Sequence, residues 1–498
     1  MLTSILSPVL ATPALISLAP LLPLLAVAAI VAARRHPDLR EACSLAAALA
    51  LFVVCCLLYA RLEQGEVLEA HWFELLPGLA VAFHVERLGM LFSLIASALW
   101  FVTILYAIGY MRAHQEANQT RFYACFAIAI GAVMGVAFAQ NLFTLFIFYE
   151  ALTLCTYPLV AHAGTDKARR GARVYLAILL STSIAFFLPA ILITWHLAGT
   201  LDFSVGGVLP DETPLGLLSL MLLLFAFGIG KAALMPFHRW LPAAMVAPTP
   251  VSALLHAVAV VKAGVFTLLK VGLYIFGPEM LGSIPATQWL LYLAGASILL
   301  ASLVAMRQDN LKARLAYSTV SQLGYVTLGA LLAVGAGIGG AAMHIAMHAF
   351  GKITLFFCAG AILVASHESE ISRMRGLGRQ MPWTMVAFFI ASLSIIGLPP
   401  TGGTWSKWYL MLGSLHADQL ALMAVLMLSS LLNIAYLLPI PLRGFLSAPV
   451  SGHEGHREAP LACLLAIGVT SLMCLLLFFR PQPLYELIAP LMALGVER

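Results

Sequence analysis

Charge is the scarcest property of this sequence. Only 10% of its 498 residues are Asp, Glu, Lys or Arg, whereas 62% are hydrophobic. A typical soluble domain has about 25% charged and about 45–50% apolar residues. So few charges cannot cover the surface of a water-soluble protein of this length, which excludes a soluble fold. Because a helix needs about 20 apolar residues to cross a membrane, the chain has room for roughly a dozen crossings or more.

Cysteine pairs with the spacing of a metal site are also absent. The 8 cysteines lie inside apolar runs, and none belongs to a C-x-x-C motif. This spacing argues against a disulfide framework and against zinc and iron–sulfur sites, so we expect no metal and no cofactor. The net charge of +5 gives no reason to expect nucleic acid as a partner. No basic stretch precedes the first apolar run, so we expect no cleaved signal peptide.

Long apolar runs dominate what is present. They predict an all-α polytopic membrane protein with about 14 transmembrane helices, because each run is close to 20 residues or longer. The longest connection, about residues 62–87, is too short for a separate folded domain. The predicted spans are 13–33, 42–61, 88–111, 122–139, 142–162, 171–198, 215–235, 252–275, 287–306, 311–333, 337–366, 382–414, 418–444 and 459–479.

Basic residues are unevenly distributed between the connecting segments. The segments after odd-numbered spans hold 18 Lys and Arg residues, and those after even-numbered spans hold only Arg61 and Arg87. Since basic loops stay in the cytoplasm, we expect a multi-pass protein of the cell inner (plasma) membrane with both termini on the outer side. The only carboxylate well inside a predicted span is that of Glu150.

Several ionisable side chains lie inside the predicted spans, where each costs about 2.5–3.5 kcal/mol and usually marks a proton or ion path. Burial disfavours a charged lysine and a nearby carboxylate favours it, so a lysine whose partner approaches and withdraws can bind and release a proton. Structural ion pairs are the alternative, but one carboxylate cannot neutralise three buried lysines. The predicted proton-translocation residues are Glu150, Lys231, His256, Lys262, His344, His348, Lys352 and Lys407.

The eleventh span gives part of this set a geometry. His344, His348 and Lys352 are spaced i, i+4, i+8, so they lie on one stripe of a helix in steps of about 6 Å. Water between these side chains would complete a proton wire. A metal site is the alternative for the two histidines, but Ile345 replaces the Glu of an H-E-x-x-H motif and no third ligand is evident.

The other basic residues of the spans are placed less regularly. His256 and Lys262 are six residues apart, about 240° around a helix, so they do not both face one path directly unless the helix is distorted or water bridges them. Lys270 lies near the outer end of the eighth span, where we expect its ammonium group to extend to the lipid headgroups. Two roles stay open for Lys312 at the cytoplasmic start of the tenth span: it anchors the helix or takes part in transport.

Two predicted spans are interrupted by proline and glycine beside a lysine. The seventh contains Lys231 shortly before Pro236, and the twelfth has Gly-Leu-Pro-Pro-Thr-Gly-Gly before Lys407. Broken helices at matching places in two halves of a transporter indicate an ion site and an internal repeat. The breaks lie five spans apart, so we expect two five-helix repeats, inverted because five is odd. The expected divisions are 1–121 for helices 1–3, 122–275 for the first repeat, 287–444 for the second, and 459–498 for helix 14 and the tail.

Three stretches together resemble one family. Lys231-Ala-Ala-Leu-Met-Pro-Phe-His-Arg-Trp-Leu-Pro and Ala247-Pro-Thr-Pro-Val-Ser-Ala-Leu-Leu-His256 are similar to the signature of the proton-translocating antiporter-like membrane subunits. Asp309 to Tyr325 is similar to the family's tenth span. The family comprises the L, M and N subunits of respiratory complex I, the A and D subunits of Mrp-type cation/proton antiporters, and relatives in membrane-bound hydrogenases. The resemblance extends over about residues 80–415.

This resemblance implies fourteen helices, inverted repeats, broken helices 7 and 12, and a role for each predicted residue. Glu150 would pair with Lys231, and Lys262, with His256, would form a central relay. His344, His348 and Lys352 would link the central relay to Lys407, which would be the ionisable residue on the exit side.

Details of the motifs point to a subtype. The Pro-Thr-Pro-Val-Ser segment resembles the L subunit of complex I and the Mrp A subunit, whereas Lys262, Lys407 and the chain length resemble the Mrp D subunit. We therefore expect the D-type subunit of an Mrp-type monovalent cation (Na+)/proton antiporter, with other integral membrane subunits as partners and no redox or hydrolytic chemistry of its own. The alternatives are a proton-pumping subunit of an NADH-quinone oxidoreductase (complex I) or a membrane-bound hydrogenase, and a scaffold that has lost transport.

Overall fold

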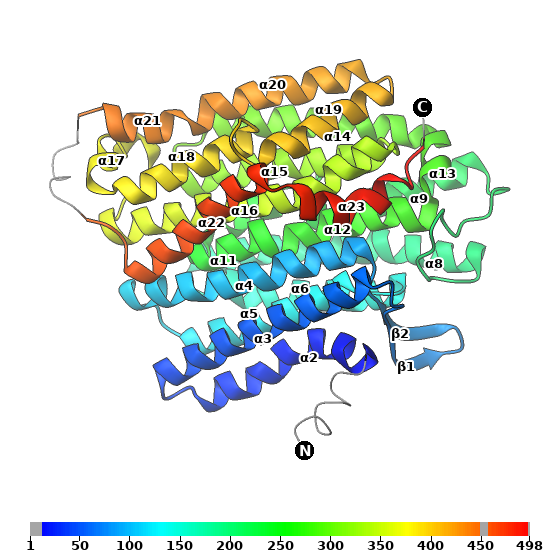
Figure 1. The fold of residues 1–498 in the computed structure, drawn as a ribbon, viewed down its shortest axis with the longest axis horizontal. Coiled ribbons are helices and arrows are strands. Elements are labelled where there is room, and N and C mark those ends of the chain that lie inside the picture. The colour runs from blue at the N-terminus through cyan, green and yellow to red at the C-terminus, as the bar shows by residue number, and fades with distance from the viewer. Residues whose placement is uncertain (1–11, 449–456, 497–498) are drawn as a thin grey trace.

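The computed structural model describes residues 12–448 and 457–496. In this part of the chain, 11 helical segments are long and apolar enough to cross a membrane, and most of them run side by side along the long axis of the molecule (Figure 1). The prediction of a helical, polytopic membrane protein is confirmed. The segments are α2 (Thr12–Ala32), α3 (Pro37–Glu63), α4 (Arg87–Ala113), α5 (Gln119–Ala137), α6 (Leu142–Val160), Asp166–Ala198, Thr249–Phe276, α14 (Pro285–Arg307), α16 (Gly335–Ser366), Leu420–Leu446 and α22 (Leu461–Phe479).

Three of these segments are composed of several elements, because short π-helical turns or a proline interrupt the regular helix. Their parts are α7 (Asp166–Thr182), η1 (Ser183–Phe187) and α8 (Leu188–Ala198); α11 (Thr249–Ala253), η4 (Leu254–Val258), α12 (Val260–Val271) and η5 (Gly272–Phe276); and α20 (Leu420–Leu437) with α21 (Pro439–Leu446).

The other three predicted spans are also helical but do not form long apolar helices. α15 (Leu311–Leu331) has the length of a span but carries many polar residues. The seventh and twelfth predicted spans are broken, as the sequence predicts, into α9 (Leu215–Gly228) with η2 (Gly230–Ala232), and into α18 (Pro382–Ile396) with α19 (Gly403–His416). The number of membrane crossings and the inverted repeats stay predictions.

Glycine shapes both breaks. A Cβ on Gly264 of α12 would lie 2.2 Å from the carbonyl carbon of Lys231. In the second break Gly397 has φ of 87°, a conformation that glycine adopts without strain, and a Cβ on Gly403 would lie 1.8 Å from the backbone oxygen of Ser394. The breaks are therefore places where one backbone approaches another closely.

A hairpin and a short C-terminal helix were not predicted. Strands β1 (Glu69–Leu76) and β2 (Leu79–His84) form an antiparallel hairpin inside segment 62–87, which was judged too short for a separate folded domain. The short helix α23 (Gln482–Met492) follows α22 and packs against α16 and α4. Short helical turns fill other connections: α10 (Trp240–Ala243), η3 (Ala244–Val246), α13 (Pro278–Ser283), η6 (Ile371–Arg373) and α17 (Leu377–Gln380).

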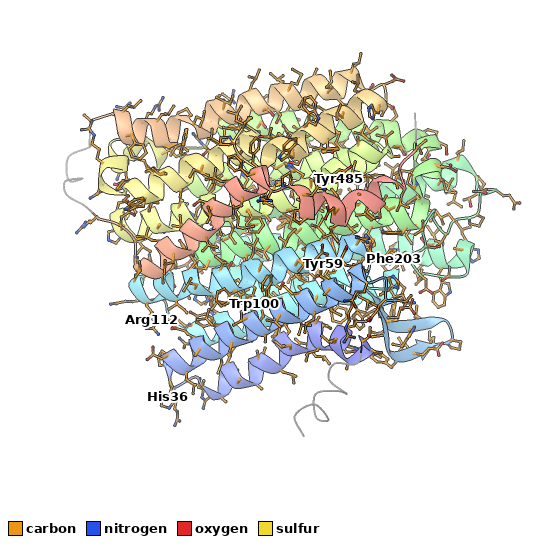
Figure 2. The ribbon with its side chains drawn as sticks, in the orientation of Figure 1. His36, Tyr59, Trp100, Arg112, Phe203 and Tyr485 are labelled. Carbon is orange, nitrogen blue, oxygen red and sulfur yellow. The ribbon has the colours of Figure 1, made fainter. Side chains whose placement is uncertain are left out.

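The connections divide between two ends of the bundle. β1, β2 and α13 lie at one end, which we call the hairpin face, and α17 and the end of α21 lie at the other (Figure 1). His36 and Arg112, from segments predicted to be cytoplasmic, are labelled far from the hairpin, whereas Phe203 lies beside it (Figure 2). The helices in the middle are the most buried, since all of the apolar window of Thr249–Phe276 is inaccessible from outside.

Candidate functional site: a row of buried ionisable residues

The predicted site residues lie in the interior of the bundle. The side chains of Lys231, Lys262 and Lys352 have no exposed area, and Lys407 is 5% exposed. The three histidines are buried as well, and both carboxylate oxygens of Glu150 are inaccessible. Ionisable groups at this depth are costly and mark function by default.

Lys231 is held at the first break by α6. Its ammonium group donates hydrogen bonds to the backbone oxygen of Tyr149 at 2.8 Å and to the hydroxyl of Thr153 at 2.5 Å. Its Nζ lies 3.1 Å from the centre of the Tyr149 ring, a cation–π contact. The backbone N–H of Lys231 donates to the Tyr149 hydroxyl at 3.1 Å. Trp240 closes the break, because its indole N–H donates to the oxygen of Gly230 at 3.0 Å.

Glu150 does not pair directly with Lys231 in this structure, contrary to what the resemblance implied. Neither carboxylate oxygen of Glu150 has a hydrogen-bond partner among the described residues. The reason is geometric: Lys231 contacts Tyr149 and Thr153, which share one stripe of α6, and Glu150 is turned about 100° from Tyr149 around that helix. The carboxylate is thus buried and unpartnered on the helix that holds the lysine.

Lys262 and His348 join the two predicted halves of the chain. The Nζ of Lys262 on α12 lies 2.7 Å from Nδ1 of His348 on α16. A contact of this length needs one donor and one acceptor, so one of the two nitrogens carries the hydrogen that lies between them. Both residues were predicted for the path, but the spacing within one helix did not reveal that they touch.

His344 continues the row from His348. The two rings stack with centres 5.8 Å apart, and His344 stacks on Tyr325 at 5.4 Å. The two ring nitrogens of His344 are bonded to the hydroxyl of Ser406 at 2.9 Å and to the amide oxygen of Gln322 at 3.1 Å. Both nitrogens therefore have neutral partners, and among the described residues no cluster of three His, Cys, Asp or Glu forms a metal site.

Lys407 lies at the second break, at the far end of the row. Its ammonium group donates to the backbone oxygen of Ile396 and to the hydroxyl of Ser430, each at 3.0 Å. Its Nζ lies 4.7 Å from the centre of the Tyr325 ring, on which His344 stacks. Tyr325 therefore connects the histidines to Lys407.

Two predicted residues stand beside this row. Lys352 donates to the hydroxyl of Ser318 at 2.6 Å and to the backbone oxygen of Leu315 at 3.3 Å, so it turns towards α15. His256 lies in the π-helical turn η4, and neither ring nitrogen has a partner among the described residues. Its ring lies 4.8 Å from that of Phe356.

Two tyrosines of the candidate site were not singled out by the sequence. Tyr149 and Tyr325 each receive a break lysine over the ring, Lys231 in one case and Lys407 in the other. The tyrosines lie in the fifth and tenth predicted spans and the lysines in the seventh and twelfth, so the arrangement recurs at the five-span offset. Tyr149 precedes Glu150 directly, which is the only sequence signal that pointed near it.

Two basic residues that were set aside are held inside the protein. Lys270 is 1% exposed and paired with Glu86, so the expectation that it extends to the headgroups is wrong. Its partner lies far away in the sequence, at the start of α4. Lys312 donates to the backbone oxygen of Ala247 at 2.5 Å, which ties α15 to the segment after the first break.

Comparison with known proteins shows the family of the chain. The family described as NADH:quinone oxidoreductase/Mrp antiporter, TM, matches residues 139–433. NADH-quinone oxidoreductase subunit N of Desulforudis audaxviator is 36% identical over 365 residues, which cover 72% of this chain and 71% of that protein. The A/B subunit of a probable K(+)/H(+) antiporter from Rhizobium meliloti is 36% identical over 372 residues, covering 73% of this chain and only 36% of that longer protein.

A solved structure shares the fold over nearly the whole length. A chain of the Mrp complex from Dietzia sp. superposes with a TM-score of 0.85 at 22% identity, covering 96% of this chain and 97% of that one. The match, like the sequence relatives, is a membrane subunit of a multisubunit assembly. The chain therefore belongs to the family of membrane subunits shared by NADH:quinone oxidoreductases and Mrp antiporters.

Proposed function

We propose that the chain is a proton-translocating subunit of a multisubunit membrane complex, and that this complex is an Mrp-type monovalent cation (Na+)/proton antiporter in which it is the D-type subunit. One observation carries the proposal: a buried row of proton-binding groups leads from Lys262 through His348, His344 and Tyr325 to Lys407. Groups of this kind in a bundle interior transfer protons.

The first break would load this row. Lys231 is held by a backbone oxygen and a hydroxyl, while the carboxylate of Glu150 is free of hydrogen bonds to described residues. A movement of Glu150 towards Lys231 would favour the ammonium form, and withdrawal would favour release of the proton. Gly264, which follows Lys262 by two residues, packs against the backbone of Lys231. The loading site and the relay therefore lie on contacting segments.

The repeat supports the same function. Both breaks place a lysine over a tyrosine ring, which is the correspondence expected of the proposed units 122–275 and 287–444. We propose 1–121 and 459–498 as the flanking helices, a plasma-membrane location, and both termini on the outer side. Supporting this orientation, the hairpin face carries connections poor in basic residues.

The test removes the loading site without changing its size. We expect Glu150→Gln and Lys231→Met each to abolish proton-coupled transport by the assembled complex in proteoliposomes, measured with an internal pH dye. Lys167→Met is the matched control, because Lys167 is exposed near the start of α7 and should be dispensable. Assembly is checked by co-purification of the partner subunits. Full transport in both site variants would refute the proposal. The chain would then be assigned a scaffold role.

A second candidate is a proton-pumping membrane subunit of an NADH-quinone oxidoreductase. The observation that favours it is the 36% identity with a protein named as subunit N of such an enzyme, over 71% of its length. Purification of the native complex separates the candidates. Flavin or iron–sulfur subunits in the complex would identify a redox-driven enzyme, whereas only small membrane subunits beside antiporter-like chains would identify the antiporter.

A further inference from the structure

A cavity of about 230 Å³, lined in part by ionisable side chains, opens beside the hairpin. It is large enough for several water molecules, each of which occupies about 30 Å³ in the liquid. Side chains from five separate parts of the fold contribute to it, and the ionisable ones are Glu69, His84, Glu86, Asp202, Lys270 and Tyr274. Phe203, also in its wall, lies at the hairpin face (Figure 2).

Lys270 lies at the base of this cavity. Its Nζ is 3.1 Å from Oε1 of Glu86 and donates a hydrogen bond to the backbone oxygen of Ala139 at 2.9 Å. The hydroxyl of Tyr274 donates to Oε2 of Glu86 at 2.7 Å. The Lys270 side chain is 1% exposed and that of Glu86 is 15% exposed, so Glu86 is the more accessible member of the pair.

Lys270 also lies on the helix of the central relay. It follows Lys262 by eight residues on α12, which corresponds to about 12 Å along the helix and about 80° around it. Thr267 lies between them, buried, with its hydroxyl bonded to the oxygen of Ala263 at 2.7 Å. Lys270 is therefore two helical turns from the relay on one side, and the pair adjoins the cavity on the other.

We propose that Lys270 and Glu86 form a proton port that connects the central relay with the aqueous space at the hairpin face. The proposal rests on the proposed function, since a port has meaning only if the chain carries protons. In the outward direction, the ammonium of Lys270 transfers a proton to the carboxylate of Glu86, which leaves a neutral amine and a carboxylic acid. The acid then releases the proton to water in the cavity, and the reverse steps take a proton in.

The other charged groups around the cavity are arranged to receive such a proton. The carboxylate of Glu69 lies 3.1 Å from Nδ1 of His84, and Asp202 stands in the wall. These acceptors lie further out than Glu86, because the side chains of Glu69 and His84 are 44% and 39% exposed. Proton acceptors thus extend from the buried pair to the surface.

A purely structural ion pair that ties α4 to α12 is the competing explanation, and one substitution separates the two. Lys270→Arg keeps a positive charge beside Glu86, and the adjacent cavity accommodates the larger side chain. A guanidinium group stays protonated at every physiological pH, so it cannot pass a proton on. A structural pair would tolerate this change, whereas a port would not.

The experiment measures proton-coupled transport by the complex in proteoliposomes. We expect Lys270→Arg and Glu86→Gln each to lower the rate at least about tenfold, as loss of a proton-transfer group does. Glu63→Gln is the matched control: it removes a carboxylate at the same face that is paired with Arg87 at 2.8 Å and lies outside the cavity wall. Unchanged transport in Lys270→Arg would overturn the port. If Glu150→Gln still abolishes transport in that case, the proposed function stands without it.

A second measurement tests the port if Lys270→Arg fails to assemble. Val205 is 67% exposed and lines the cavity. A membrane-impermeant maleimide on Val205→Cys should slow transport severalfold relative to the same preparation before labelling, with the labelled parent chain as the control for native thiols. Complete labelling without a change in rate would overturn the port.

Discussion

The close approach of α12 to the first break leads to a prediction that can be worked out from the structure. A Cβ on Gly264 would lie 2.2 Å from the carbonyl carbon of Lys231 and 2.3 Å from the nitrogen of Ala232. Both are backbone atoms and cannot swing aside as a flexible side chain would. An ordinary contact begins at 3.4 Å, so the break must retreat by about 1.2 Å in Gly264→Ala.

This displacement reaches the loading site. Lys231 donates to Tyr149 and Thr153 at 2.8 and 2.5 Å, and a shift of about 1.2 Å takes either contact beyond hydrogen-bonding distance. Overpacking of this kind costs about 1–3 kcal/mol. We therefore expect Gly264→Ala to unfold at a lower temperature in detergent. Because Lys231 loses its partners on α6, we also expect the transport rate to fall at least about tenfold, as it does when a proton-transfer group is lost.

The control is another glycine in a membrane helix. Gly468 of α22 has no atom within 4 Å of the position of a Cβ, so Gly468→Ala should keep its transport rate and its stability or gain slightly from helix propensity. The assays are thermal unfolding of the purified complex and dye-based proton uptake in proteoliposomes. Equal Tm and equal transport for Gly264→Ala and the parent protein would refute the reasoning.

Two further predictions concern the relay and the acid stability. Lys262→Met removes the partner of His348 Nδ1, so we expect proton-coupled transport to fall at least about tenfold while the complex still assembles. An unchanged transport rate in proteoliposomes would exclude Lys262 from the path. His162, just after the end of α6, is buried, and burial lowers its pKa below the ordinary 6.5. Because the unfolded chain binds this proton more tightly, stability should fall as the pH drops below about 6.5. His162→Phe should weaken that dependence in unfolding curves at pH 5 and pH 8, and identical curves for both proteins would refute the assignment.

The sequence predicted the helices and breaks well because both follow from local chemistry. Apolar runs of span length become helices wherever they occur, and proline and glycine beside Lys231 and Lys407 interrupt them. The hairpin was missed because its strands are short and lie in a segment judged by length alone. Its turn lies at Pro77-Gly78, a dipeptide typical of turns, and Gly78 has φ of 79°.

The candidate site was predictable as a set of residues but not as a set of contacts. An ionisable residue inside an apolar span identifies Lys262 and His348 separately, whereas the contact between them depends on how α12 and α16 pack. The surroundings of Lys270 were predicted wrongly for the same reason, since its partner Glu86 is distant in the sequence and comes close only in the folded chain. The pairing of Glu150 with Lys231 came from family resemblance, whereas the contact of Lys231 with the face of α6 that carries Tyr149 and Thr153 depends on how the helices pack.

The contact between Lys262 and His348 also has a mechanical consequence. It is made across the boundary between the two proposed halves, at 2.7 Å, and it ends once the two helices separate by about one ångström. If the chain carries protons as proposed, a small shear between α12 and α16 would interrupt conduction before either half changed its internal structure. The contact would then limit leakage, because protons could cross it only while the two halves are in contact.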